Sequence, residues 1–345
     1  MKILFASYQA VMLLKGGPRT QILRTKKHLE DLGVQVTFHD PWKDVRNEDF
    51  DLVHLFGANI GTYHFGRELR RKGMPFVVTP IFFSLHSPLF LSLGLRAERF
   101  LAKMLKGIWI DYGFLADLCE WSKLVMPNTR REAGLLRSGL GIDRDKIVVV
   151  PNGVEERFYG ADPSLFVKRY GINNFILSVG HIGPERKNVL RLFRALEKIN
   201  HPAVFIGRKE DTEAGRMCLR EAEKNPNLLV LDSIPNDSDE LASAYAASDV
   251  FALPSFFETP GIAALEAALA GSKIVITKYG GTDEYFGGFA RYVEPKSVES
   301  IGQGIAAALK DVKNVQLREH IRKNFLWQSV AEQTLDAYKR VVGSH

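Results

Sequence analysis

The chain has 345 residues, 46% of them apolar and 25% charged, which is typical of a globular protein long enough for two domains. Its net charge is +6, and all of the excess lies in residues 1–160, with 23 Lys and Arg against 17 Asp and Glu, since residues 161–345 hold 23 of each. The two cysteines are far apart and no apolar run approaches the ~18 residues of a membrane span, so neither a disulfide framework, a zinc site nor an integral membrane protein is indicated. A reduced, cytoplasmic setting is expected, because the apolar start of the chain is too short for a signal peptide.

Strand signals alternate with helix signals through the first half of the chain. A helix is expected from Pro18 to about Leu32, where apolar residues have helical spacing and Gly33 provides a stop. This alternation predicts a parallel sheet covered by helices on both faces, with ligands at the carboxyl ends of the strands. The expected strands are Lys2–Tyr8, Val34–His39, Asp51–Gly57 and Phe76–Thr79.

A glycine pair, Gly16 and Gly17, precedes the first predicted helix and so belongs beside the ligand edge of the sheet. Without side chains there, a diphosphate or an acceptor can pass close to the backbone, and the neighbouring Arg19 can reach an anion. The alternative is that the pair is only a turn, which is the commoner role of such glycines.

Residues 81–115 combine apolar and basic character. An apolar stretch over 81–91 is followed by a helical pattern with one apolar face and one basic face, which is suited to an anionic lipid surface. The alternative is a core-packed helix with a solvated basic face. The basic residues are Arg96, Arg99, Lys103 and Lys106.

The first half is expected to close with strands around Trp121–Thr129 and Lys146–Val154, and the second of these stretches contains the turn signal Pro151-Asn152-Gly153. The domain boundary is placed between about Glu155 and Asp162. The second half then restarts the alternation with a strand over Phe175–Gly180. Further strands are expected at Ala203–Gly207, Leu228–Leu231, Val250–Pro254 and Lys273–Thr277.

The loop after the Phe175–Gly180 strand carries two adjacent cations, Arg186 and Lys187. At the mouth of a parallel sheet, such a pair can neutralise a diphosphate, the arginine as a fork of donors and the lysine as a point charge. Gly180, the last residue of the strand, leaves room for the ligand.

The stretch Phe256–Ala267 follows another predicted strand and opens a helix, with Pro260 expected in its first turn. The amides of Gly261 and Ile262 at this helix start would favour an anion. Glu258 and Glu266 lie on either side of them, and we expect both to accept hydrogen bonds from hydroxyl groups. The alternative is an amphipathic helix with a capping carboxylate and one ion-paired glutamate.

A glutamate, seven residues and a second glutamate resemble the donor motif of retaining glycosyltransferases of family 4, which have the GT-B fold. The resemblance implies an α/β protein of two Rossmann-like, doubly wound parallel-sheet domains facing a cleft. It further implies that Glu258 faces the transferred sugar and Glu266 holds the ribose, with Arg186 and Lys187 on the diphosphate. The Gly16-Gly17 pair and the turn Tyr279–Glu284 are also similar to family loops, and Glu284 is expected to brace the second of these.

The chain departs from the family pattern at two places. His181 stands where many members have a phosphate-binding arginine, and Thr79-Pro80-Ile81 stands where a histidine often faces the donor sugar. Ser84 and His86 are the nearby candidates to replace that histidine. Asp143-Arg144-Asp145 and Asp237-Ser238-Asp239 have the DxD pattern of a metal site but are expected to cap turns and helices.

The C-terminal stretch Phe325–Val342 resembles the family helix that crosses back to the first domain. The expected division is an acceptor-binding domain over 1–160, a nucleotide-sugar domain over 161–325 and this helix within 326–345. The resemblance implies transfer of a sugar from a UDP- or GDP-sugar to a saccharide acceptor, expected to be lipid-linked, in cell-surface polysaccharide or glycolipid assembly. No metal or other cofactor is expected, and the balanced charge of the second half argues against nucleic acid. The alternatives are an epimerase or phosphorylase of the same fold and a non-catalytic binding module.

Overall fold

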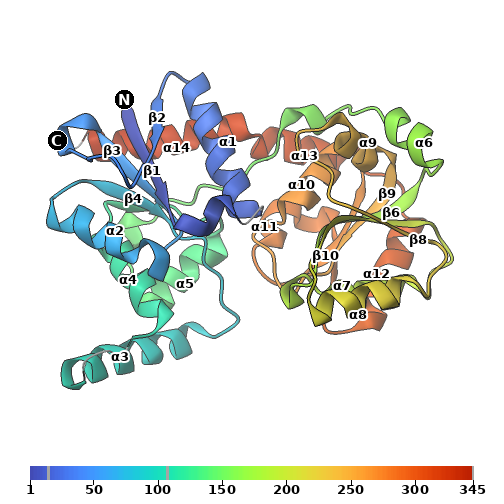
Figure 1. Cartoon of the computed structure of the whole chain (residues 1–345), viewed down its shortest axis with the longest axis horizontal. Coiled ribbons are helices and arrows are strands. Elements are labelled where there is room, and N and C mark those ends of the chain that lie inside the picture. Colours follow the sequence, from blue (N-terminus) through green and yellow to red (C-terminus); the bar gives the residue numbers. More distant parts are fainter. Residues whose placement is uncertain (14–15, 106–108, 344–345) are drawn as a thin grey trace. The chain divides into compact units, whose positions relative to one another are not determined.

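The computed structural model describes residues 1–13, 16–105 and 109–343, which form two compact units. Unit 1 comprises Met1–Gly153 and Trp327–His345, and unit 2 comprises Val154–Leu326 (Figure 1). The boundary therefore falls several residues before the expected end of the first domain at 160. Residues 154–160 belong to unit 2 because Val154 pairs with Leu326 and Phe158 is fully buried in the core of that unit.

Unit 1 is built on a five-stranded parallel sheet in the order β2-β1-β3-β4-β5. Its strands are β1 (Lys2–Ser7), β2 (Gln35–Phe38), β3 (Leu52–Phe56), β4 (Phe76–Thr79) and β5 (Leu124–Val125). Its helices are α1 (Gly17–Asp31), α2 (Ile60–Arg71), α3 (Pro88–Met104), α4 (Asp111–Trp121), α5 (Arg130–Leu140) and α14 (Trp327–Val342), with short 3-10 turns η1 (Gln9–Met12), η2 (Asn47–Asp49) and η3 (Arg144–Lys146). The expected strand over 146–154 is absent, because this stretch makes only one isolated bridge, from Ile147 to Val125. Pro127, which follows β5, has no N–H with which to continue a ladder.

Unit 2 is built on a six-stranded parallel sheet in the order β11-β10-β9-β6-β7-β8. Its strands are β6 (Phe175–Ile182), β7 (Ala203–Lys209), β8 (Leu228–Leu231), β9 (Ser248–Leu253), β10 (Lys273–Thr277) and β11 (Arg291–Val293). Its helices are α6 (Ser164–Tyr170), α7 (Val189–Leu196), α8 (Glu213–Ala222), α9 (Asp239–Ala247), α10 (Ile262–Ala270), α11 (Thr282–Phe286), α12 (Val298–Lys310) and α13 (Val315–Phe325), with 3-10 turns η4 (Glu156–Phe158), η5 (Glu185–Lys187) and η6 (Gly287–Phe289).

Both sheets are doubly wound, as expected. Each unit has a separate hydrophobic cluster on either side of its sheet, because buried parallel strands expose apolar side chains to both faces. In both units the strand order reverses at one position, between β1 and β3 in unit 1 and between β6 and β9 in unit 2. These positions are where ligands bind in open α/β sheets.

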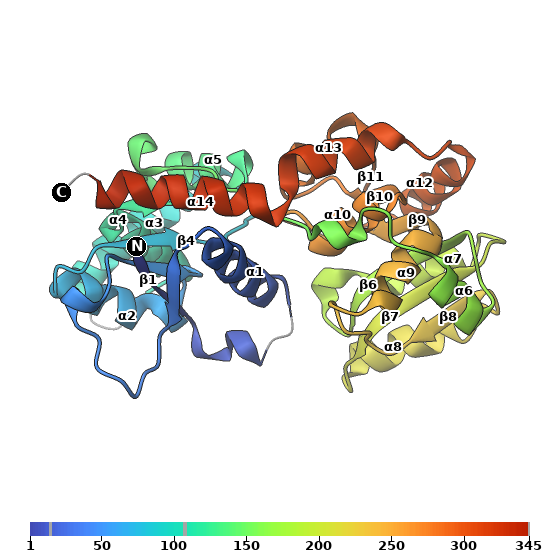
Figure 2. The ribbon, with the colours of Figure 1, turned by 90° about the horizontal axis from the view of Figure 1, so that it is seen from above.

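The expected C-terminal helix over Phe325–Val342 is present as α14, which begins at Trp327 and ends at Val342. Leu326 has extended backbone angles and separates α13 from α14. The chain after Leu326 belongs to unit 1, where α14 lies along α1 (Figure 2). The hydroxyl group of Tyr338, on α14, lies 2.6 Å from Nδ1 of His54 on β3, and both side chains are buried. This hydrogen bond ties the last helix to the central strand of unit 1.

Candidate active site

The loops that follow β6 and β9 meet at the switch point of unit 2. The amide of Phe256 donates to the carbonyl of Arg186 over 2.9 Å, so the two loops are joined through their backbones. Asn188 reinforces the junction, because its buried side-chain amide donates to the carbonyls of Pro254 (2.8 Å) and Pro295 (2.7 Å). Residues about 70 positions apart in the sequence are thereby held in one place.

Three of the predicted site residues are in direct contact at this junction. Oε1 of Glu258 lies 2.7 Å from Nζ of Lys187 and 3.5 Å from Nη1 of Arg186, whose guanidinium also donates to the Phe257 carbonyl. Burial by itself raises the pKa of Glu258, but the charges of Lys187 and Arg186 outweigh it and the net pKa is lowered. Glu258 is therefore held as a carboxylate between two cations.

A third loop supports the backbone of Glu258. The Glu258 amide donates to the carbonyl of Tyr279, and the Gly281 amide donates back to the carbonyl of Glu258. A Cβ on Gly280 would lie 1.8 Å from the Glu258 oxygen, and the φ of Gly280 is +107°, so only glycine fits this approach. Glu284 lies on the short helix α11 that follows, and its amide donates to the Gly281 carbonyl.

Helix α10 begins at Ile262, four residues after Glu258. Gly261 precedes the helix with a φ of +82°, the left-handed conformation that glycine adopts readily. The expectation that Pro260 lies in the first helical turn is wrong, because Gly261 is the N-cap of the helix and Pro260 precedes it.

Glu266 lies in the second turn of α10 and is buried. Its Oε1 accepts a hydrogen bond from Nδ2 of Asn236 (2.7 Å) and its Oε2 one from the hydroxyl of Tyr245 (2.8 Å). Both partners were missed from the sequence. Asn236 lies on the polar loop after β8 and Tyr245 on the helix α9 that follows, and nothing in this segment indicates that it faces a glutamate 30 and 21 residues later.

Strand β6 continues to Ile182, two residues past Gly180. His181 is paired with Arg208 of β7, so it is a strand residue and not the first residue of a loop. The added length follows from β7, which also extends beyond the expected Gly207. A Cβ on Gly207 would lie 1.6 Å from the carbonyl oxygen of Gly180, so glycine at 207 permits this pairing.

In unit 1, the glycine pair lies at the start of α1, which follows β1. Gly16 is the residue before the helix and Gly17 its first residue. Arg19 is half-buried in the first turn, and its Nε is buried without a hydrogen-bond partner within the described part of the chain. These residues stand at the carboxyl end of β1, at the switch point of that sheet.

The loop after β4 contains both candidates for the missing family histidine. Oγ of Ser84 accepts a hydrogen bond from the amide of His86, whose exposed ring stacks on Phe90 with centroids 4.5 Å apart. Ile81 in the same loop has a φ of +55°, which is strained for a β-branched residue.

Glu132 anchors this loop and was also missed. It is buried, and its two carboxylate oxygens accept from the amides of Phe82 and Asn128, each over 2.7 Å. Its own amide donates to Oγ1 of Thr129, which caps α5. The sequence signal was available, because Thr129 followed three residues later by Glu132 is the pattern of a capping box.

No group of three His, Cys, Asp or Glu side chains suited to hold a metal occurs among residues 1–13, 16–105 and 109–343. In the first DxD pattern, Asp143 caps η3 as expected, by accepting from the amide of Asp145. In the second, Ser238 and not an aspartate caps α9.

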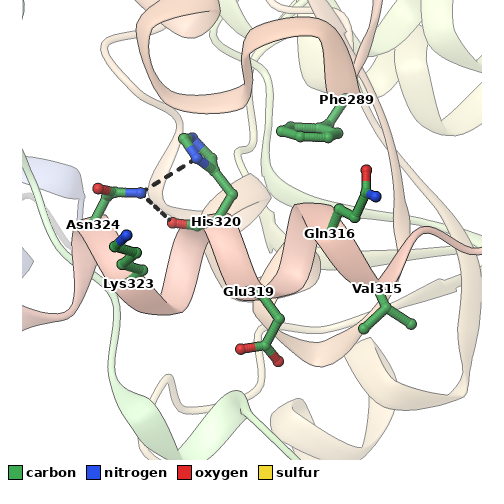
Figure 3. A pocket seen from close by; sticks show the side chains of 7 residues that line it. All are labelled: Phe289, Val315, Gln316, Glu319, His320, Lys323 and Asn324. Atoms are coloured by element: carbon green, nitrogen blue, oxygen red, sulfur yellow. Dashed lines mark hydrogen bonds between the residues drawn. The ribbon is translucent and has the colours of Figure 1, made fainter.

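Two surface hollows of unit 2 lie elsewhere. One, of about 410 Å³, is formed along α13 and includes Phe289 and His320 (Figure 3). The second, of about 420 Å³, includes Lys273, the first residue of β10, and so lies at the amino ends of the strands. None of the predicted site residues lines either hollow, and neither hollow is lined by the loops that meet at the switch point.

Comparison with solved structures gives the same architecture. A sucrose-phosphate synthase from Thermosynechococcus elongatus superposes with a TM-score of 0.77 over 100% of both chains at 16% identity. HepE from Anabaena, solved in complex with UDP-glucose, superposes with a TM-score of 0.63 over 100% of this chain and 98% of its own at 18% identity. Both likenesses concern the fold.

Sequence relatives are glycosyltransferases. The MMP alpha-(1->4)-mannosyltransferase of Mycolicibacterium hassiacum is 25% identical over 318 residues, 86% of this chain and 72% of that protein. The D-inositol 3-phosphate glycosyltransferase of Paenarthrobacter aurescens is 26% identical over 256 residues, 63% of this chain and 57% of that protein. The chain thus spans little more than half the length of the second relative.

Two family models divide the chain between them. The model for glycosyl transferases group 1 matches residues 167–325, within unit 2, and the model for glycosyltransferase family 4 matches residues 38–158, which end just past unit 1. The first match contains the whole Glu258–Glu266 stretch and the Arg186-Lys187 loop. With two parallel α/β units, GT-B structural neighbours and glycosyltransferase relatives, the chain belongs to the group 1 glycosyltransferases of the GT-B fold.

Proposed function

We propose that this glycosyltransferase takes a sugar from a UDP- or GDP-sugar and transfers it, with retention of configuration, to a lipid-linked saccharide. The observation that carries the donor half of the proposal is the junction of the β6 and β9 loops. There Lys187, Arg186 and the start of α10 are gathered around Glu258. Two cations and a helix N-terminus in one place suit a diphosphate, and a fixed carboxylate beside them suits a sugar hydroxyl.

Each residue has a distinct part in this proposal. Lys187 and Arg186 neutralise the diphosphate as the bond from the sugar carbon to the phosphate oxygen breaks, and no metal is needed. Only one of the three N–H donors of Lys187 is used by Glu258, so others remain for phosphate oxygens. Glu258 orients the sugar, Glu266 binds the ribose, and the leaving diphosphate takes the proton of the acceptor hydroxyl as the new glycosidic bond forms. Within unit 2, the glycine loop after β10 lets the donor approach the backbone, and within unit 1 the Gly16-Gly17 pair after β1 leaves the backbone open to a ligand.

Of the named proteins, HepE is the one whose bound ligand matches such a donor. One is a mannosyltransferase, another acts on D-inositol 3-phosphate, and HepE was solved with UDP-glucose bound. These substrates and ligands are those of the named proteins. For this chain we propose only the class of donor, a nucleotide sugar.

A thermal-shift panel of UDP- and GDP-sugars tests the donor half. A ligand at a hundred times its Kd should add about 2.7 kcal/mol to the free energy of unfolding. We expect one nucleotide to stabilise the wild type and Lys187→Ala to lose most of that gain. The matched control is Lys273→Ala, since Lys273 is also an ion-paired, largely buried lysine, 2.9 Å from Asp249, but lies at the opposite ends of the strands. Equal loss in both variants, or no shift with any donor, would contradict the assignment.

Product analysis tests the chemistry. Incubation with donor and a lipid-linked acceptor should yield a glycoside with the donor's anomeric configuration, read by NMR. Conversion of the sugar in the absence of acceptor would instead indicate an epimerase.

The lipid-linked acceptor is proposed from the surface of α3. The helix packs against α5 through Leu91 and Leu95, which are buried. A second apolar face points away from that contact, with Phe100 64% and Met104 69% exposed, and the outer end of the helix projects from the rest of unit 1 (Figure 1). The core-packed alternative therefore accounts for only one of the two apolar faces. The exposed apolar side chains of the helix are Leu89, Phe90, Leu93, Phe100, Leu101 and Met104.

A basic row runs beside the exposed apolar face. Arg96, Arg99 and Lys103 follow at helical spacing and are exposed, whereas Lys106 lies outside the described residues. Arg99 also lies 3.3 Å from a carboxylate oxygen of Glu120. An apolar face next to a basic row is the arrangement of a helix that lies in an anionic membrane surface. We propose that α3 brings the enzyme to its acceptor there, on the cytoplasmic face. Within the described residues, no helix has both the length and the apolar character needed to cross a membrane.

Vesicle co-sedimentation tests this surface. Wild type should bind vesicles of mixed anionic and zwitterionic lipid, and the double variant Phe100→Ser and Met104→Ser should bind several-fold less. The control is the double variant Val312→Ser and Val315→Ser, because these valines of unit 2 are equally exposed, 89% and 70%. If neither pair of changes alters binding, or wild type ignores anionic vesicles, α3 is not a membrane surface.

A further inference from the structure

Each carboxylate oxygen of Glu266 accepts a hydrogen bond from another side chain of unit 2. Asn236 holds Oε1 over 2.7 Å and Tyr245 holds Oε2 over 2.8 Å. Hydrogen bonds of this length to a charged carboxylate are strong, so both partners help to hold the side chain of Glu266 in place. Any ribose hydroxyl that binds Glu266 must share an oxygen with one of them or replace it.

The two partners have opposite surroundings. Tyr245 lies on α9 and is completely buried, and burial, followed by the nearby charge of Glu266, raises the pKa of its phenol well above the usual value. The phenol therefore keeps its proton and remains a donor to Oε2 at neutral pH. Asn236, by contrast, is exposed on the loop between β8 and α9.

The backbone of that loop is held independently of the Asn236 side chain. The guanidinium of Arg157 donates through Nη2 to the carbonyl of Asn236 and through Nη1 to the carbonyl of Ser238, the latter over 3.2 Å. Ser238 also caps α9 by accepting from the amide of Leu241. With its main chain anchored, Asn236 can rotate its amide into solvent without moving the loop.

We propose that the Asn236 amide occupies the place of a ribose hydroxyl on Oε1 of Glu266 and is exchanged for it when a nucleotide binds, while Tyr245 stays on Oε2. This inference rests on the proposed function, in which Glu266 binds the ribose. An N–H and an O–H are equivalent donors to a carboxylate, so either satisfies Oε1. Without Asn236 the buried oxygen would lack this donor between catalytic cycles, which is unfavourable.

The exchange has a consequence for selectivity. A ribonucleotide replaces the lost Asn236 bond with its own hydroxyl, whereas a deoxyribonucleotide cannot and leaves Asn236 in place. The Asn236 bond thus lowers the affinity for ribonucleotides, and removing it should increase the preference for ribose. If Asn236 instead keeps its hydrogen bond while the ribose hydroxyl also binds Glu266, Asn236 helps to orient Glu266 for the ligand. Removing Asn236 should then weaken the binding of ribonucleotides and reduce the preference for ribose.

The experiment is calorimetric titration of UDP and GDP, with their 2′-deoxy and 3′-deoxy analogues, into wild type, Asn236→Ala and Tyr245→Phe. We expect Asn236→Ala to bind the ribonucleotide about fivefold more tightly, with little change for the deoxy analogue that lacks the bound hydroxyl. Tyr245→Phe should weaken the ribonucleotide and reduce the discrimination between ribose and deoxyribose. Asn324→Ala is the matched control, since Asn324 is an exposed asparagine of unit 2 on α13.

The outcomes separate the two proposals. If ribonucleotides bind wild type but Asn236→Ala weakens them or leaves the ribose preference unchanged, the exchange is refuted and the donor site stands. If no nucleotide binds wild type, both fail. If Tyr245→Phe does not fold, the Asn236→Ala result still tests the exchange. Asn236 is exposed, so replacing its side chain should leave the protein folded. As a second readout, the side-chain amide NMR signals of Asn236 should move to solvent-like positions on adding the ribonucleotide and stay unchanged with the deoxy analogue.

Discussion

The contact between Gly280 and Glu258 gives the sharpest test of how the active-site loops are positioned. A methyl group at 280 would lie 1.8 Å from the carbonyl oxygen of Glu258, 2.7 Å from its carbonyl carbon and 2.9 Å from its nitrogen. All three are backbone atoms, so no side-chain rotation can relieve the clash. The backbone of Glu258 would have to retreat by about 1 Å or more to reach van der Waals distance.

Gly280→Ala should therefore act on catalysis more than on stability. A displacement of about 1 Å at a positioned group can cost a factor of about 100 in rate. The left-handed backbone at Gly280, with a φ of +107°, adds strain of about 1–2 kcal/mol for any residue with a Cβ. We expect kcat/KM to fall about 100-fold while the protein still folds.

Gly271→Ala separates the clash from the strain. Gly271 has a similar φ, +101°, but a Cβ there would have nothing within 4 Å. Gly280→Ala should lose at least as much stability in urea unfolding as Gly271→Ala, because it adds the clash to the shared strain, and only Gly280→Ala should lose activity and donor affinity. If both lose activity equally, or if Gly280→Ala keeps wild-type kcat/KM, the argument that this backbone approach positions Glu258 is wrong.

Three further predictions concern buried polar groups. Tyr338→Phe should lower the free energy of unfolding by about 1–3 kcal/mol in urea, because Nδ1 of buried His54 loses its 2.6 Å partner; an unchanged midpoint would contradict this. Burial lowers the pKa of His54 to about 3, so between pH 6.5 and 3 the unfolded chain binds a proton that the folded chain does not, and stability should fall with decreasing pH by up to about 1.4 kcal/mol per unit. His54→Gln should reduce that slope in pH-dependent urea unfolding, and an identical slope would exclude His54 as its source. The pKa of Glu258 is lowered by Lys187 and Arg186 against the effect of burial, so Lys187→Met should move the acid limb of the kcat/KM profile to higher pH, and a stationary limb would show that Glu258 does not govern it.

Much of the fold could be predicted from local patterns. Continuous apolar strands alternating with helices specify a doubly wound parallel sheet, and β4 and β8 have the bounds that were expected. The failures have local reasons. Residues 146–150 have the composition of a strand, but Pro127 offers no N–H to pair with. The strand β11, only three residues long, is too short to leave a signal.

Only part of the candidate site could be predicted from the sequence. Glu258, Glu266, Arg186 and Lys187 stand out because their motifs lie in short, recognisable stretches. Asn236 and Tyr245 do not, since nothing in their own segment refers to Glu266. Glu132 had a local signal, but that signal indicates a helix cap and says nothing of the amide of Phe82 that it also holds.

The sequence by itself determined most of the strands, the positions of the glycines and cations that follow them, and the family that the motifs resemble, because all of these depend on neighbours within a few residues. Only the tertiary structure decided that Lys187 and Glu258, 71 positions apart, share one hydrogen bond. It also decided that α3 keeps one apolar face outside the core. Contacts of this kind depend on strand order and on the direction in which each helix crosses the sheet, and those are set by the packing of the whole unit and not by any short stretch of it.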